Sequence, residues 1–477
     1  MLVRDEPVLR AGSSLGYGPL GEPDPLGVRL PAGFSARLVA TSGRAVGGTG
    51  HTWHTAPDGG ATFARPGGGW VYASNSEAST DGGVGVVAFD ADGAVDGAYA
   101  VLTGTSRNCA GGPTPWGTWL SCEEHPGGRV WECDPLTPGQ GVVRPGLGTF
   151  HHEAAVVHEA SGQVFLTEDR PDGRLYRFVP DTPGDLSSGA LFAARSSITP
   201  ASMTTADVAE ITWVPTSAGA PDRASTTSAF AGGEGAWVDG DRLLFTTKRD
   251  VRVWSLDLAT PTPRLRVLHD CVATPGTPLD AVDNIVVHPV TGSIFVAEDG
   301  GNMQLCVAHE RAGGIAIEAF VQFEGQSGSE VTGPAFSPDG RRLYVSSQRG
   351  TDGAGLTYEI TGPFAPAPPP TTTTTTTTSP TTSPTTTSST TTTSAPTTTS
   401  APSTTTTAGP TTSTTQPTTT TTGPVATDPP TSSTTAPPTT TTGPTTIAPG
   451  GPIDRVARGR GEGLEHARRD RGRRADR

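Results

Sequence analysis

The chain has 477 residues, of which 47 are acidic and 33 basic, and a formal net charge of −14. Residues 1–364 carry 41 of the acids and 24 of the basic residues, a net charge of −17, which disfavours nucleic acid as a partner and favours cations. Short apolar runs between Gly, Pro and Asp-Gly turns, without long helical periodicity, predict an all-β domain over residues 12–364 after a flexible N-terminus at 1–11.

Six apolar hairpins follow one another in this domain, at residues 62–77, 109–124, 153–169, 234–248, 284–298 and 333–347. The hairpins are closed by Glu77, Glu124, Asp169, Lys248, Asp299 and Gln348. Successive closing residues lie 47, 45, 79, 51 and 49 positions apart. A repeat of this length is typical of a four-stranded propeller blade. The sequence therefore predicts a six-bladed β-propeller, with an insertion around residues 186–228 in the longest interval.

The polar ends of these hairpins are expected to converge. In an antiparallel hairpin, the residue before the first strand and the residue after the second lie at the same end. If the hairpins are the inner strands of successive blades, their ends meet at the mouth of the central channel. The sixth hairpin is predicted to bring no acid; the others bring Asn75, Glu77, Cys109, Glu123, Glu124, Glu153, Glu168, Asp169, Glu234, Asp283, Asn284, Glu298 and Asp299.

This set of side chains predicts bound metal. Confined carboxylates raise one another's pKa unless cations compensate them, and Ca²⁺ accepts many oxygen ligands in loose geometry. Cys109 adds a soft thiolate, which indicates a transition metal such as iron beside calcium. One acid after a strand is more often a turn residue, and one cysteine more often a buried apolar side chain, so the prediction depends on the repetition. His151 and His152, just before Glu153, are candidates for ligands or for structural residues.

Two segments of biased composition follow the domain. Residues 365–451 are almost entirely Thr, Ser and Pro, which predicts a disordered stalk of the kind found on secreted or cell-surface proteins, with a plain linker as the alternative. Residues 452–477 form an arginine-rich tail that acids dilute. The first 35 residues contain no apolar segment and no paired arginines, so a cytoplasmic location stays open. One disulfide, Cys122–Cys133 or Cys271–Cys306, would favour export.

Residues 108–124, NCAGGPTPWGTWLSCEE, closely resemble the PhoX family of bacterial alkaline phosphatases. The resemblance continues in order through the segments at 69–77, 150–157, 166–169, 234–237, 283–287 and 296–299. It covers nearly the whole predicted domain, and a 17-residue block with Cys, Trp and paired Glu is far more specific than a short motif.

The resemblance implies a six-bladed propeller that hydrolyses small phosphomonoesters at a cluster of Fe³⁺ and Ca²⁺, in a protein expected to be a monomer. Cys109 would bind iron. The candidate catalytic groups are Cys109, Glu234, Asn284 and Lys248, and the metal ligands would come from Cys109, Glu123, Glu124, Glu153, Glu168, Asp169, Glu234, Asp283, Glu298 and Asp299.

One position departs from the family pattern. Family members usually carry an arginine two residues before the glutamate of the EG motif, where it can clamp phosphate, and this chain has Gly232 there. Lys248 and Arg349, both at hairpin ends, are candidates to replace it. A calcium-dependent lactonase or esterase and a non-catalytic, calcium-braced surface protein are the alternative functions.

Overall fold

The computed structural model describes residues 16–364 apart from 140, 220, 222, 224, 312 and 313. In that part of the chain the helical elements are two short 3-10 turns, η1 (Pro145–Leu147) and η2 (Pro200–Ser202), and all other elements are strands. The all-β prediction is confirmed. No helix there is long and apolar enough to span a membrane. The predicted segments 1–11, 365–451 and 452–477 lie outside the described residues.

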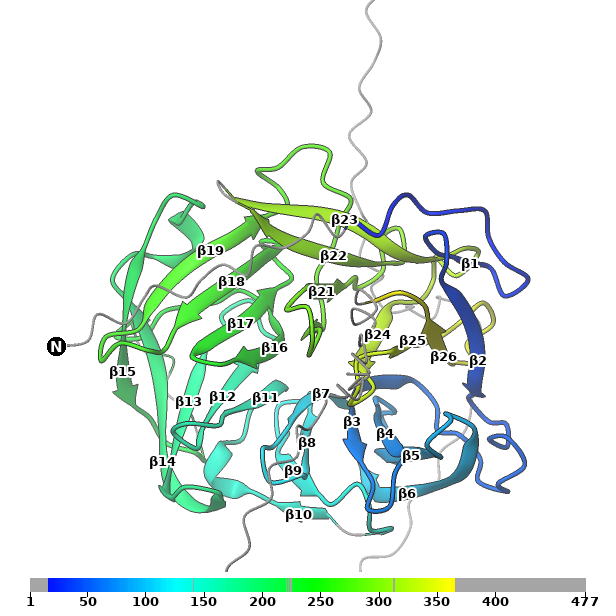
Figure 1. The fold of residues 1–477 in the computed structure, drawn as a ribbon. Coiled ribbons are helices and arrows are strands. Elements are labelled where there is room, and N and C mark those ends of the chain that lie inside the picture. The colour runs from blue at the N-terminus through cyan, green and yellow to red at the C-terminus, as the bar shows by residue number, and fades with distance from the viewer. Residues whose placement is uncertain are drawn as a thin grey trace, which may run out of the picture. The chain divides into compact units, whose positions relative to one another are not determined.

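The strands form five sheets, in which every pairing is antiparallel, arranged like a propeller around a central axis (Figure 1). Two of the four-stranded sheets consist of β3 (Pro57–Ala64), β4 (Trp70–Ser76), β5 (Gly82–Phe89) and β6 (Val95–Thr105), and of β7 (Asn108–Pro113), β8 (Trp119–Glu123), β9 (Val130–Cys133) and β10 (Gly141–Val143). A third joins β2 (Ser35–Thr41) to β24 (Val331–Phe336), β25 (Arg342–Ser347) and β26 (Leu356–Thr361). The five-stranded sheet consists of β1 (Val28–Arg29), β20 (Ile285–Val287), β21 (Ile294–Ala297), β22 (Gln304–Arg311) and β23 (Gly314–Phe323).

The remaining sheet has nine strands and contains two consecutive antiparallel meanders. The first is β11 (His152–His158), β12 (Gln163–Glu168), β13 (Tyr176–Thr182), β14 (Asp185–Ser196) and β15 (Ala209–Pro215). The second is β16 (Gly233–Asp239), β17 (Arg242–Thr247), β18 (Arg252–Asp257) and β19 (Arg264–Asp270). Only two residue pairs, between β15 and β19, join the meanders. β14, η2 and β15 fall in the stretch around residues 186–228 that was predicted to be an insertion.

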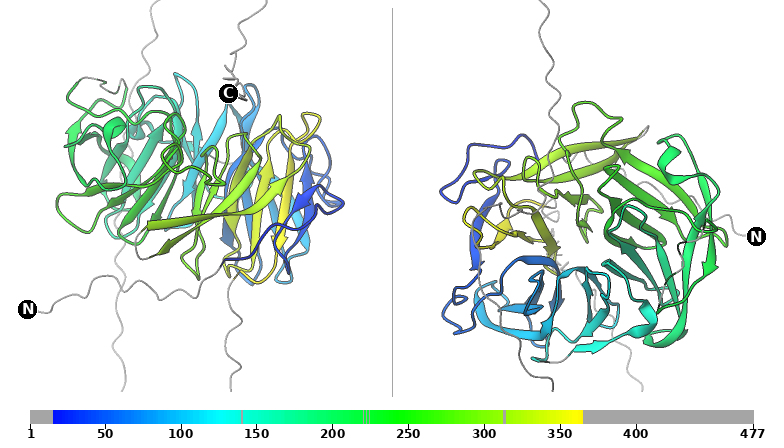
Figure 2. Two further views of the ribbon diagram at one scale, coloured as in Figure 1. Left: turned by 90° about the horizontal axis from the view of Figure 1, so that it is seen from above. Right: turned by 180° about the vertical axis from the view of Figure 1, so that it is seen from behind.

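Each predicted hairpin corresponds to a strand pair: β3–β4, β7–β8, β11–β12, β16–β17, β20–β21 and β24–β25. Figure 1 shows β3, β7, β11, β16 and β24 nearest the axis, and the side view in Figure 2 shows the strands running roughly along it. β4 and β11 are buried along their whole length, because neighbouring sheets cover both of their faces.

The buried apolar side chains of the described residues gather in six clusters. Each cluster mixes side chains from neighbouring strand groups, as where Leu120 of β8 packs with Leu166 of β12. The ring closes non-covalently where β2 pairs with β26 over registers from Ser35–Thr361 to Thr41–Leu356. The inner hairpin ends are thus held around the axis by packing on both sides.

Candidate metal centre

A two-residue β-bulge interrupts the start of four inner hairpins at the same place. Pairing skips two residues in each case, and the first residue of each skipped pair is Asp58, Cys109, Glu153 or Glu234. A bulge adds an unpaired residue and redirects its side chain, which is why bulges are frequent beside active sites. Here the bulged side chains of three successive hairpins meet, since Cys109 Sγ lies 3.6 Å from Asp58 Oδ2 and 3.5 Å from Glu153 Oε1.

The second residue of these bulges is small because neighbouring hairpins approach backbone to backbone. A Cβ on Gly59 would lie 2.6 Å from the Cα of Ala110, and one on Gly235 would lie 2.5 Å from the Cα of Asn284. Contacts this short exclude any side chain. The glycines therefore let the bulged residues come within reach of one another.

The paired acids that close three hairpins divide into two roles, because successive residues point to opposite sides of a strand. The first acid of each pair is buried and accepts hydrogen bonds, most of them from backbone amides, in the loops at the end of its hairpin. Glu123 accepts from the amides of Ser106 and Arg129, Glu168 from the amide of Arg174 and the hydroxyl of Tyr176, and Glu298 from the amides of Asp280 and Gln304. In this structure Glu123, Glu168 and Glu298 brace loops.

The second acid of each pair faces the axis. Glu124 lies in a group with Glu77 and Cys109, whereas Asp169 and Asp299 both contact the ammonium of Lys248. The structure thus brings Glu124, Asp169 and Asp299 together around the axis.

Among the residues that the structure describes, three groups of side chains have ligand atoms within 4.8 Å of one another, close enough to share a cation. They are Glu77–Cys109–Glu124, Asp58–Glu77–Glu330 and Glu153–Glu234–Asp283. The last two offer only carboxylate oxygens, the ligands that Ca²⁺ prefers, and the first adds a sulfur to carboxylates, a donor set that suits a transition metal.

The electrostatics of these groups fit bound cations. Burial, followed by the neighbouring acids, raises the pKa of Asp58 and Glu153 well above the ordinary carboxyl value. The same causes raise the pKa of Asp283 to about 8 and that of Glu124 to about 7. Burial and the adjacent carboxylates also raise the pKa of the Cys109 thiol. Only a nearby positive charge would hold all these groups ionised together.

A polar atom without a partner indicates the same. Gln348 Oε1 is buried and makes no hydrogen bond, a costly arrangement that a cation would relieve. The other end of Gln348 is fixed, because its amide nitrogen donates to Asp58 Oδ2 at 2.5 Å and to Glu77 Oε2 at 3.1 Å. The residues present therefore suit a set of oxygen-liganded cations.

Two members of these groups were not predicted from the sequence. Asp58 begins the bulge in β3, upstream of the predicted hairpin start at residue 62, and Glu330 directly precedes β24. The prediction that the sixth hairpin brings no acid is wrong, because its first strand begins at Val331, earlier than predicted, which puts Glu330 at its end.

Two amides at the centre connect hairpins. Asn284 accepts from the amide of Gly333 at 2.7 Å and donates to Asp283 Oδ1 at 2.9 Å, so it orients one of the acids. Asn75 is buried and donates to the carbonyls of Cys109 and Ala110. Both side chains hold the bulges of neighbouring hairpins in place.

The histidines and the cysteines other than Cys109 are less involved. His152 is buried with its Nε2 on the carbonyl of Gly148, and burial lowers its pKa to about 3, whereas His151 Nδ1 lies 4.0 Å from Glu124 Oε1. All five cysteines are described and all are free. The two candidate disulfides, Cys122–Cys133 and Cys271–Cys306, are therefore not formed in this structure.

A family model described as alkaline phosphatase PhoX matches residues 88–130 and 125–250. The structure of Pseudomonas fluorescens PhoX in complex with vanadate, a transition state analogue, aligns with 72% of this chain and 97% of that chain, with a TM-score of 0.59 and 17% identity. The resemblance to the PhoX family is confirmed.

A gluconolactonase of Xanthomonas campestris aligns with 72% of this chain and 98% of its own, with a TM-score of 0.41 and 13% identity, too low to bear on function. No curated protein sequence matches the chain. The structural alignment with Pseudomonas fluorescens PhoX covers more of the chain than the family model does, and over that length it shows a shared fold.

The glycine at the position of the PhoX-family arginine is required by the backbone. Gly232 has a φ of +69°, and a Cβ there would lie 3.0 Å from Arg249 Cγ, 3.1 Å from Lys248 Cγ and 3.2 Å from Asp169 Oδ1. The side chain of Lys248 thus lies where an arginine at 232 would begin.

Proposed function

We propose that this protein is a metal-dependent phosphatase that hydrolyses small phosphomonoesters at a mixed iron and calcium cluster on the propeller axis. The observation that carries the proposal is the placement of Cys109 between the acids of neighbouring hairpins, next to three groups of potential ligands. The match to the PhoX model, which includes Cys109, supports the same chemistry.

The donor chemistry suggests which residues would hold each metal. Cys109 with Glu77 and Glu124 would hold iron, and the two all-carboxylate groups would hold calcium. Once bound, such ions polarise phosphoryl oxygens and stabilise the charge on the attacking and leaving groups. The residues of the chain supply the rest, namely the positions of the ligands and a contact for the substrate.

Arg349 is our candidate for that contact. Its guanidinium Nη1 lies 3.0 Å from Glu330 Oε1 and its Nη2 3.9 Å from Glu77 Oε2, which places it beside two of the metal groups. Its side chain is 47% exposed, so donors remain available to an incoming phosphate. Lys248, the other candidate, contacts three carboxylates at once and is less available.

We also propose that the domain has six blades. Each meander of the nine-stranded sheet would count as one blade, because in the described residues only the two β15–β19 register pairs link the meanders into one sheet. Six apolar clusters between neighbouring strand groups support that count, since a closed ring has as many inter-blade cores as blades.

The Thr/Ser/Pro-rich segment leads us to propose that the protein acts outside the cell, secreted or at the surface. Fractionation of cells that express the full chain would test this. Recovery of the protein only in the cytoplasm would contradict it.

Metal analysis of the purified protein together with a phosphomonoester assay tests the function. We expect iron and calcium together, and in Cys109→Ala a loss of iron with phosphate release reduced about 100-fold or more. Calcium alone, with no phosphate release, would reject the phosphatase. Lactone hydrolysis under those conditions would then favour the lactonase, and no turnover would favour a calcium-braced binding protein.

A further inference from the structure

Lys248 is the only lysine in the chain, whose other 32 basic residues are arginines. It directly follows β17 and corresponds in register to the axis-facing acids Glu124, Asp169 and Asp299 of other hairpins. All other basic side chains are guanidinium groups, so the one side-chain ammonium lies in the acid cluster.

Three carboxylates surround this ammonium. Lys248 Nζ lies 3.0 Å from Asp169 Oδ2, 3.0 Å from Glu234 Oε1 and 3.4 Å from Asp299 Oδ2. The three acids come from three different hairpins. Each all-carboxylate group described above likewise brings together three carboxylates, at a distance that suits one cation.

We propose that the Lys248 ammonium permanently fills a cation site, so that the group Asp169–Glu234–Asp299 takes no metal ion. An ammonium is a compact point charge that accepts separate carboxylates from several directions, whereas the planar guanidinium of arginine prefers one carboxylate side on. Lysine is therefore the basic residue that can stand in for a spherical ion.

The shared acid connects this site to the metal groups. Glu234 contacts Lys248 and also belongs to the group with Glu153 and Asp283. The ammonium thereby fixes the position of one metal ligand while lowering the number of ions that the cluster needs. Lys248 is in this sense a positioning residue.

Metal stoichiometry tests the proposal directly. Removing the ammonium in Lys248→Met leaves three adjacent carboxylates, and we expect this variant to bind one more Ca²⁺ per chain than the wild type. Lys248→Arg keeps the charge and should bind the wild-type number. Lys248→Met/Asp299→Asn has only two acids left in the group and should lose the additional ion. An unchanged calcium count in Lys248→Met, or an additional ion in Lys248→Arg, would overturn the inference.

A second measurement needs no variant. Because the chain has one lysine, an amine-specific reagent modifies only Lys248 and the N-terminal amine, which serves as the internal reference. We expect modification of Lys248 in the metal-free protein to be slow relative to the N-terminus, and to stay as slow when Ca²⁺ is added. An increase on calcium addition would mean that an ion displaces the ammonium, which rejects the proposal.

The inference rests on the proposed metal cluster but not on phosphate hydrolysis, and the two can fail separately. If the protein proves not to hydrolyse phosphomonoesters, the calcium counts would still test the role of Lys248. A wild type with bound metal and the same count in Lys248→Met would reject only the role of Lys248.

Discussion

The side-chain amide of Asn75 donates hydrogen bonds to the backbone carbonyls of Cys109, at 3.0 Å, and of Ala110, at 2.7 Å. Its own oxygen accepts from Trp119 and Ser121 of β8. A buried residue of one hairpin therefore satisfies both carbonyls of the bulge that presents the thiol in the next.

We expect Asn75→Asp to disturb this bulge more than a simple loss of packing would. The carboxylate cannot donate, so two buried carbonyls lose their partner, at a cost of about 1–3 kcal/mol each. Iron content, measured per chain, should fall even though no ligand is changed. Asn302→Asp, at an exposed loop amide, is the control. Full iron content in Asn75→Asp would contradict this role.

The pH dependence of stability should change when calcium is added. In the metal-free protein the folded-state pKa values of Glu124 and Asp283, about 7 and about 8, exceed their ordinary values of 4.5 and 3.8. The folded state then holds more protons than the unfolded state, so the free energy of unfolding falls as pH rises from roughly 5 to 8.

Calcium competes with those protons and should stabilise more at pH 8 than at pH 6. Thermal melts at both pH values, with calcium and with a chelator, check this. An equal shift in Tm at both values would show that these carboxyls do not bind the ion.

Restoring the family arginine in Gly232→Arg should destabilise the protein and not raise phosphatase activity. The position has a φ of +69° and crowds Lys248 and Arg249, so both backbone strain and steric overlap oppose any side chain. Gly232→Ala should cost about 1–3 kcal/mol in chemical denaturation. Gly43→Ala is the matched control, because Gly43 has a φ of +73° with open space around its Cβ, so the difference between the two isolates crowding.

Arg349→Ala should raise KM for phosphomonoesters about 10-fold or more while leaving metal content unchanged, because a charge-assisted contact to the substrate is lost. Arg349→Lys should recover part of the loss, since it returns a point charge. The control is Arg341→Ala, whose side chain is 78% exposed in the turn between β24 and β25. Equal KM values in Arg349→Ala and the wild type would remove Arg349 from the site.

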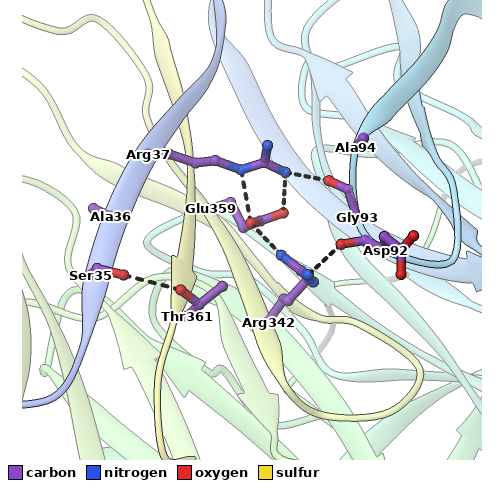
Figure 3. A pocket seen from close by; sticks show the side chains of 9 residues that line it. All are labelled: Ser35, Ala36, Arg37, Asp92, Gly93, Ala94, Arg342, Glu359 and Thr361. Atoms are coloured by element: carbon purple, nitrogen blue, oxygen red, sulfur yellow. Dashed lines mark hydrogen bonds and ion pairs between the residues drawn. The ribbon is translucent and has the colours of Figure 1, made fainter.

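Glu359 holds the closing strand of the ring to its neighbours (Figure 3). Its buried carboxylate accepts from Arg37 of β2 and Arg342 of β25, and these arginines also donate to the carbonyls of Gly93 and Asp92. Glu359→Ala would leave the partly buried Arg342 without a carboxylate partner, and we expect a loss of about 3–5 kcal/mol in urea denaturation. Arg37→Ala, at a residue with a 45% exposed side chain, should cost less than about 1 kcal/mol.

The periodic part of the fold could be predicted from the sequence because the hairpins repeat their own local signals. The closing residues Glu77, Glu124 and Asp169 follow apolar strands, and strand alternation aims each of them at the axis. The same alternation turns Glu123 and Glu168 away from it, which the sequence could not show without the exact strand ends.

Contacts between hairpins that are far apart in the chain could not be predicted from the sequence. Asp58 and Glu330 lie 272 positions apart in the chain and meet only once the ring has closed. The pairing of Gln348 with Asp58 likewise depends on neighbouring hairpins at the two ends of the domain. No local pattern carries that information.

The closure between β2 and β26 also sets the order of events during synthesis. One ligand group combines Asp58 and Glu77 with Glu330, and the strand that completes the ring ends only at Thr361. The nascent chain therefore cannot assemble that group until nearly the whole domain has left the ribosome. Metal loading of that group would therefore be a late maturation step, and the supply of ions in the compartment where the ring closes would determine which cation it receives.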